Sequence, residues 1–359
     1  MALRSIAVAL AAVGLTIFAP NASADGTGPF AYVPVVSDGA VLVVDTAADR
    51  VVQRIENAGP YASSVTASRD GRKLYVQAFN PPFVGTDDIA VIDRESNTVT
   101  SRIPITGTDG LAQPIADPVR DQVYILTARP SIDVLSTKTD TLLRSMPLPA
   151  IPFAAAIAPD GSRVYAVFAD STAAAFDPES GFQLGQRIQI DGSVPYAAVI
   201  SPDGRKLYSM NVLGDNVSVI DTAGWQRTGA ISFGAGSAPV AGAISPDGTR
   251  LLVATVGSDA VQVVDIATDR VVGTVPVDAP VSVGFTADGA KMYVGSLGPQ
   301  ARPLVPTAIA GFDATEVLPA FLQANPRPGT LIPFGTSDFQ QAGAPIGIGS
   351  GPGSAAFSH

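Results

Sequence analysis

The sequence predicts an all-β fold, a seven-bladed β-propeller built from four-stranded antiparallel blades. Three observations lead to this prediction: a turn motif that recurs along the chain, an alternating strand that follows it in each unit, and a composition rich in turn and strand residues. The chain has 35 Gly and 30 Pro among 359 residues, with many Val, Ile and Thr, which is typical of short strands joined by tight turns. A single closed domain can therefore account for a length that would otherwise suggest two or three.

The recurring turn ends in Asp-Gly and precedes an apolar strand. Its clear copies begin at Ser68, Ala158, Ser201, Ser245 and Thr286. When the units are aligned on the aromatic or aliphatic residue just after the turn, seven positions fall 41 to 49 residues apart: Tyr32, Tyr75, Tyr124, Tyr165, Tyr208, Leu252 and Tyr293. This spacing is the length of one propeller blade, so we expect seven blades.

Each unit continues with an alternating strand that ends in Asp, followed by a polar turn and another strand. The strand-end residues are Asp45, Asp93, Asp177, Asp221, Asp265 and Asp313, with Ser136 in the third unit. We expect these Asp side chains to cap the following turn. We also expect the Asp of each Asp-Gly turn to be a turn former rather than a catalytic or calcium-binding acid; these residues are Asp70, Asp160, Asp203, Asp247 and Asp288.

The two ends of the chain are expected to complete one blade together. A proline stands upstream of six innermost strands, at Pro60, Pro114, Pro152, Pro195, Pro239 and Pro280. The first unit has only Asp25 to Phe30 ahead of Tyr32, whereas the C-terminal segment, residues 351–359, supplies Pro352 and a strand-like SAAFS. We predict that this segment is the innermost strand of the first blade and closes the ring, because open sheet edges invite pairing with other chains.

The last blade is less well defined in the sequence. Its third strand is expected to end at Asp313, and either residues 316–323 or residues 330–335 could form its outer strand. Residues 324–346 are expected to be an irregular segment within the single propeller domain, which spans residues 25–359.

Residues 1–24 have the pattern of an export signal. Arg4 is followed by an apolar run from Ser5 to Ala19 and by an Ala-Ser-Ala ending. The run is shorter than the roughly 20 residues of a spanning helix, so no transmembrane segment is expected after removal of the signal. We expect an exported monomer, either periplasmic, held in the cell envelope, or secreted.

The charge and the residue types that are absent exclude several functions. Removal of the signal leaves 21 basic against 32 acidic residues, a net charge of −11, so no nucleic-acid partner is expected. The chain has no Cys, and its sole histidine is the last residue, His359. Disulfides, thiolate nucleophiles, haem ligation by His and multi-His metal sites are therefore excluded.

The segment from Ser201 to Thr222 reads SPDG, then KLY, then VSVID. This pattern resembles the YVTN family of β-propeller repeat proteins, and the resemblance extends from about Phe30 to Gln323. It implies seven blades, export and mostly binding roles, while related propellers include sugar lactonases and the large subunits of some periplasmic dehydrogenases. The DPVRD turn at Asp117 and the Ser136 position depart from the pattern, so we expect a distorted third blade.

Function is expected on the face that carries the irregular loops, because such loops on a regular scaffold are where binding residues are usually found. The longest are residues 79–88 and 296–307, and both contain several prolines. The residues after the upstream prolines should form a ring near the mouth of the central channel, or else pack between blades. These residues are Tyr61, Ile115, Phe153, Tyr196, Val240, Val281 and Gly353. The candidate ligand-binding residues are Tyr61, Phe153, Tyr196, Phe83, Asp87 and Arg302.

Two functions remain open at this point. The first is a non-enzymatic scaffold that binds a protein, peptide or glycan; it needs no cofactor, and the sequence contains no recognisable catalytic group. The alternative is a lactonase-like hydrolase in which acids at the channel mouth, with a divalent cation, activate water. The acids available for calcium on this face are Asp87, Asp88, Asp109, Asp191, Asp215 and Asp259. We favour the binding function because no nucleophile and base can be paired.

Overall fold

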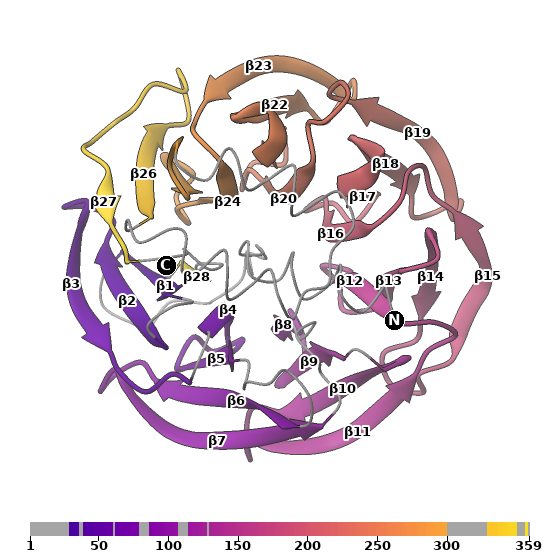
Figure 1. Ribbon diagram of the computed structural model, residues 1–359. Helices are drawn as coiled ribbons and strands as arrows, with labels where there is room; N and C mark the ends of the chain where they lie inside the picture. The colour runs from indigo at the N-terminus through magenta and orange to yellow at the C-terminus, as the bar shows by residue number, and fades with distance from the viewer. Residues whose placement is uncertain are drawn as a thin grey trace.

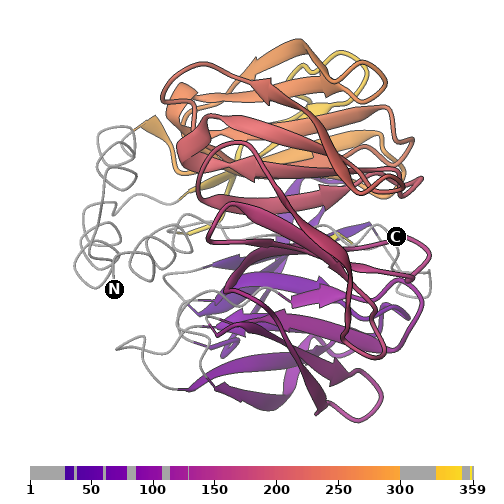
Figure 2. The same ribbon diagram turned by 90° about the vertical axis from the view of Figure 1, so that its right-hand side faces the viewer.

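The computed structural model describes residues 29–35, 39–59, 62–78, 86–106, 114–127, 129–299, 329–349 and 356–357. These residues form seven four-stranded antiparallel sheets arranged in a ring (Figure 1). The predicted seven-bladed β-propeller is therefore confirmed. In the side view, blade six lies at the top of the ring and blades two and three at the bottom (Figure 2).

The strands of each blade are given in order from the channel to the rim. Blade one has β28 (Ala356–Phe357), β1 (Phe30–Val35), β2 (Ala40–Asp45) and β3 (Arg50–Ile55). Blade two has β4 (Ala62–Ala67), β5 (Lys73–Ala78), β6 (Thr86–Asp93) and β7 (Thr98–Thr106). Blade three has β8 (Pro114–Ala116), β9 (Gln122–Leu126), β10 (Ser131–Ser136) and β11 (Thr141–Pro147). Blade four has β12 (Pro152–Ile157), β13 (Val164–Phe168), β14 (Thr172–Phe176) and β15 (Gln183–Gln189).

The remaining blades follow the same order. Blade five has β16 (Pro195–Ile200), β17 (Lys206–Asn211), β18 (Asn216–Asp221) and β19 (Gln226–Ser232). Blade six has β20 (Pro239–Ile244), β21 (Arg250–Thr255), β22 (Ala260–Asp265) and β23 (Arg270–Pro276). Blade seven has β24 (Pro280–Phe285), β25 (Lys291–Ser296), β26 (Thr330–Gly335) and β27 (Ile346–Gly347). Two short 3₁₀ helices, η1 (Val212–Gly214) and η2 (Val256–Ser258), join the second and third strands of blades five and six.

The core lies between neighbouring blades, and burial falls from the channel to the rim. Every residue of β12 is buried, whereas only one residue of β19 is. The inner strands are rich in Ala, Gly and Ser, which allows them to approach one another near the axis. A Cβ on Gly242 of β20, for example, would lie 1.9 Å from the Met210 side chain of the preceding blade. Gly242 therefore leaves the space that the end of the Met210 side chain occupies in this packing.

Two faces of the ring can be distinguished by their connections. The turn face carries the turns between first and second strands and between third and fourth strands. The loop face carries the connections between second and third strands and those from one blade to the next.

The C-terminal strand completes the first blade, as predicted. β28 pairs antiparallel with β1 through Ala31 opposite Phe357 and Tyr32 opposite Ala356. The first blade is thus built from both ends of the chain, and the inner edge of β1 is covered at these two positions.

The expected third strand of the last blade is wrong. Thr330–Gly335 pairs with β25 along its whole length and takes the place expected for the segment that ends at Asp313, which lies outside the described residues. The strand beyond it is Ile346–Gly347, so 330–335 is not the outer strand and 324–346 is not irregular throughout. Residues 316–323 lie outside the described residues. Both 309–313 and 330–335 have an alternating apolar pattern, and local periodicity cannot decide between them.

Residues 1–24 lie outside the described residues, so the export signal stays a prediction. In the part of the chain that the structure describes, no helix is long and apolar enough to span a membrane.

Candidate functional site

The acids of the Asp-Gly turns are occupied by the turns themselves. Asp203 accepts hydrogen bonds from the Ser201 hydroxyl at 2.5 Å and from the backbone N–H of Arg205 at 3.0 Å. The bond from Ser201 holds the pKa of Asp203 below its usual value. Asp70, Asp160, Asp247 and Asp288 each accept from the backbone N–H two residues later. These carboxylates therefore stabilise the turns, as predicted.

The strand-end acids also have the predicted capping role. Asp45 accepts from the N–H groups of Ala47 and Ala48 at 2.9 and 3.0 Å. The corresponding bonds are made by Asp93, Asp177, Asp221 and Asp265. Ser136 substitutes for Asp with two longer contacts of 3.3 Å. Asp313 lies outside the described residues.

Three junctions between blades share a polar contact that sequence reasoning missed. In blade five, Lys206 donates to Asp269 and to the carbonyl of Ile266 in blade six, both at 2.7 Å, and the Tyr208 hydroxyl donates to Asp269 at 2.8 Å. The Asp lies in the left-handed region, with φ 54°. Burial and the bond to Asp269 raise the pKa of Tyr208. We call this Lys-Tyr-Asp arrangement the junction latch.

The same latch joins blades two and three (junction 2/3). It also joins blade seven to blade one at the seam, where the ring closes. Lys73 and Tyr75 contact Asp140 at 2.7 and 2.6 Å. At the seam, Lys291 of blade seven contacts Asp49 of blade one at 2.9 Å, and the Tyr293 hydroxyl donates to the same carboxylate. The Lys-x-Tyr spacing in the sequence is the signal that could have revealed the latch, because alternate residues of a strand point to one face.

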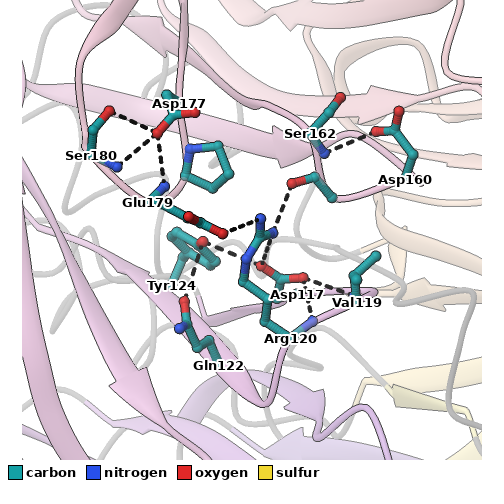
Figure 3. Close-up of polar contacts among 12 residues, drawn as sticks. Asp117, Val119, Arg120, Gln122, Tyr124, Asp160, Ser162, Asp177, Glu179 and Ser180 are labelled. Carbon is teal, nitrogen blue, oxygen red and sulfur yellow. Dashed lines mark hydrogen bonds and ion pairs between the residues drawn. The ribbon is translucent and has the colours of Figure 1, made fainter.

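The junction between blades three and four replaces the latch with a different cluster (Figure 3). The DPVRD turn buries the Asp117 side chain, which accepts from the N–H groups of Val119 and Arg120, both at 2.8 Å. The Tyr124 hydroxyl donates to the other oxygen of Asp117 at 3.2 Å. The carboxylate that Tyr124 contacts therefore belongs to its own blade, and not to the next blade as in the latches.

Arg120 then carries the contact across to blade four. Its guanidinium donates to the carbonyl of Gly161 at 2.8 Å and to Glu179 at 3.2 Å (Figure 3). Gly181, with φ 72°, occupies the turn position where the latches have Asp. The departure of the third blade from the repeat is therefore a rearranged junction, and its acid and base are engaged with each other and with the turns.

The loop-face acids that could have held calcium are used to position the next blade. Asp215 accepts from the N–H groups of Gly236 and Ala238 at 2.8 and 2.9 Å. Asp259 makes the equivalent bond to the N–H of Ala279 at 2.9 Å. These three bonds fix the connections just before Pro239 and Pro280, which begin the next inner strands.

The other loop-face acids are paired or lie outside the described residues. Asp191 forms an ion pair with Arg227, and Asp88 lies 3.9 Å from Arg102. Asp109 lies outside the described residues. Within the described ranges, no group of three or more His, Asp and Glu side chains could hold a metal ion.

The structure places only part of the predicted ligand-binding set. Phe153 and Tyr196 are both 3% exposed and lie at register shifts where β12 and β16 begin. Such bulges redirect one side chain. Tyr196 is buried so completely that the pKa of its hydroxyl is raised well above the usual value, and that hydroxyl has no hydrogen-bond partner. Asp87 lies in β6, opposite Ile105 of β7. Tyr61, Phe83, Arg302 and Gly353 lie outside the described residues.

The expected ring of residues after the prolines is not a single layer. Val240 and Val281 are at the same kind of bulge as Tyr196. Ile115, in contrast, lies opposite Tyr124. In blade five the residue opposite the equivalent Tyr208 is Val199, and not Tyr196. Its placement in the ring is therefore wrong, because Pro114 stands three residues further along its strand than the other prolines.

Comparisons with known proteins show the fold. No family profile matches the chain, and no curated protein matches it. A functionally unknown protein from Desulfotomaculum acetoxidans DSM 771 is similar, with TM-score 0.70, 15% identity and coverage of 92% of this chain and 99% of that one.

Two other similar structures carry the names of enzymes. Hydrazine synthase from Kuenenia stuttgartiensis gives TM-score 0.61 at 18% identity, covering 76% of this chain and 94% of that one. Dihydro-heme d1 dehydrogenase NirN in complex with DHE gives 0.63 at 13% identity, covering 93% and 75%. At these identities the likeness extends to the propeller fold alone.

Proposed function

We propose that this chain is an exported, monomeric propeller of the YVTN type that binds a protein, peptide or glycan through its loop face and channel mouth, without a cofactor. The observation that carries this proposal is how the described acids are used. Asp203 and its equivalents form turns, Asp45 and its equivalents cap turns, and Asp215 and Asp259 position the next blade. A lactonase-like function needs acids that are free to hold a cation or activate water, so the arrangement favours binding.

The loop face has the properties of a binding surface on a rigid support. The turn face is regular and repeats the same contacts from blade to blade, whereas loop-face connections differ in length and composition. The candidate residues Tyr61, Phe83, Asp87 and Arg302 belong to this proposal as predictions from the sequence. A variable loop surface on a repetitive scaffold is a common way to achieve recognition.

A pair of matched surface variants tests the proposal. Leu213 in η1 is 39% exposed on the loop face, and Phe182 is 75% exposed in a turn of the opposite face. The mature chain, Leu213→Glu and Phe182→Glu are each immobilised and incubated with the exported fraction of the producing cells. We expect one partner to bind the wild type and Phe182→Glu equally, and Leu213→Glu about tenfold less.

A lactone-hydrolysis assay with and without calcium completes the test. Turnover that depends on the protein and disappears with a chelator would overturn the proposal in favour of the hydrolase. Equal loss of partner binding in both surface variants would also contradict it, because the interaction would then not be specific to the loop face.

A further inference from the structure

Two buried polar side chains of blade two have no hydrogen-bond partner. Gln77 in β5 is 0% exposed and Ser64 in β4 is 6% exposed. Neither the amide N and O of Gln77 nor the hydroxyl of Ser64 is satisfied. Elsewhere in the described ranges only Ser101, Arg144 and Tyr196 have such an atom, one each. Burying an unpartnered amide is unfavourable, so an adjacent pair of this kind needs a physical reason.

The two side chains lie together on one face of the blade. Ser64 and Gln77 are directly opposite in the register of β4 and β5, which places them on the same side of the sheet. Tyr75, two residues before Gln77, reaches Asp140 of blade three. Side chains two residues apart on a strand share a face, so both polar groups are turned toward blade three.

The pair lies close to the loop face. Gln77 is the next-to-last residue of β5 and Ser64 the third residue of β4. At about 3.3 Å per residue, the two groups are about 7 Å or less from the strand ends. In blade three, β8 is described from Pro114, opposite Ile125, so the residues of this inner strand that would be level with Ser64 and Gln77 lie outside the described residues.

No other described inner hairpin carries this polar pair. The corresponding opposite pairs are Ala154 with Val167, Ala197 with Met210, Ala241 with Ala254, and Ser282 with Gly295. Packing alone thus accepts small and apolar residues here, and Met in blade five has nearly the volume of Gln. The amide in blade two is therefore not required by the fold.

The chemistry of the pair indicates a neutral ligand group. The Gln77 amide offers a donor and an acceptor, and the Ser64 hydroxyl can act as either. On the facing side of blade three, the buried acid Asp133 is already engaged by Arg129 at 3.3 Å and by the Ser145 hydroxyl at 2.5 Å. A secondary amide has one N–H donor and one C=O acceptor, and Gln77 and Ser64 together offer a partner for each.

We propose that Ser64 and Gln77 form the polar end of a loop-face binding site for a neutral secondary amide, supplied by a peptide backbone or by an N-acetyl sugar. The proposal rests on the binding function proposed above and names the group that is recognised. The C=O and the N–H of a trans amide point in opposite directions, so Gln77 bonds to one of them and Ser64 to the other. Binding thereby gives both buried side chains a hydrogen-bond partner.

The test uses the mature protein with ¹⁵N-labelled glutamine and two probes, N-acetylalanine methylamide and N-acetylglucosamine. The side-chain NH₂ signals of Gln77 are identified by their absence in Gln77→Met. We expect a saturable shift of these signals with one probe or both, which distinguishes the peptide source from the sugar source. Ser64→Ala should weaken binding about tenfold, whereas Ser282→Ala, its counterpart in blade seven, should leave it unchanged.

A stability measurement separates the possible outcomes. Gln77→Met should melt about 2 °C higher than the wild type or more, because the unpartnered amide is removed. No shift of the Gln77 signals up to the solubility limit of either probe would overturn the site, and the pair would then hold only water. Partner capture that survives in Gln77→Met would overturn the site while leaving the proposed function intact. A shift with the probes, together with the absence of any partner that binds the loop face, would overturn the proposed function while supporting the site.

Discussion

At the residue scale, one turn position decides how each blade meets the blade before it. In every turn between third and fourth strands, one residue has a positive φ; these residues are Asp49, Asn97, Asp140, Gly181, Trp225, Asp269 and Phe339. Asp faces Tyr at the three latches. Trp225 instead stacks on Tyr165 with ring centroids 5.5 Å apart, and Asn97 accepts from Tyr32 at 3.3 Å. The residues on the two sides of these junctions are therefore chemically matched: three junctions share the latch, and the junctions with Asn97 and Trp225 each use a different contact.

Substitution of a latch acid should lower stability in graded steps. Asp269→Asn keeps a side chain that accepts from Tyr208 and tolerates the positive φ, so we expect the free energy of unfolding to fall by about 1 kcal/mol. Asp269→Ala removes the acceptor of the Tyr208 hydroxyl, leaves Lys206 with the Ile266 carbonyl alone and places Ala at φ 54°, and should cost about 3 kcal/mol. Urea unfolding followed by circular dichroism measures both values. Equal costs for the two variants would show that the hydrogen bonds to Tyr208 and Lys206 contribute little.

At the element scale, the sequence allows prediction of the elements whose signals repeat. Seven units, the capping role of Asp45 and its equivalents, and the closing strand all follow from a motif in register. The third strand of blade seven does not, because the segment ending at Asp313 and Thr330–Gly335 are equally alternating, and only pairing with β25 separates them. Gln77 is also invisible in the sequence, since its burial and the lack of a partner depend on what the neighbouring blade presents.

Deletion of residues 351–359 tests the contribution of the closing strand, which among the described residues pairs with β1 at Ala31 and Tyr32. Removal of residues 351–359 would uncover the inner edge of β1 at Ala31 and Tyr32. We expect aggregation or a large fall in melting temperature, because an exposed edge pairs with other chains. Light scattering and calorimetry measure the two effects, and removal of residues 358–359 alone is the matched control. A monomeric truncated protein with wild-type melting would show that β28 is dispensable.

At the scale of the whole molecule, the ring differs from an open array of repeats. In an open array each unit contacts only its neighbours, and distant units can unfold separately. Here the last blade meets the first through β28 and through the latch between Lys291 and Asp49. The single tryptophan, Trp225, stacks on Tyr165 of blade four. It lies between β18 and β19, which are across the ring from β26, β27 and β1–β3 (Figure 1). The chain therefore contains its own reporter for coupling between opposite sides of the ring.

Loss of the latch at the seam should be detected by that distant tryptophan. Lys291→Met keeps most of the aliphatic stem and removes the charge, so we expect the melting temperature to fall by about 2–4 °C. If closure makes the ring unfold as one unit, the Trp225 fluorescence transition should move by the same amount as the far-ultraviolet circular dichroism. Lys206→Met, at junction 5/6 next to the reporter, should give the same coincident shift. A fluorescence transition that stays at the wild-type temperature in Lys291→Met, while the circular dichroism becomes biphasic, would mean that the blades near the seam unfold without the rest.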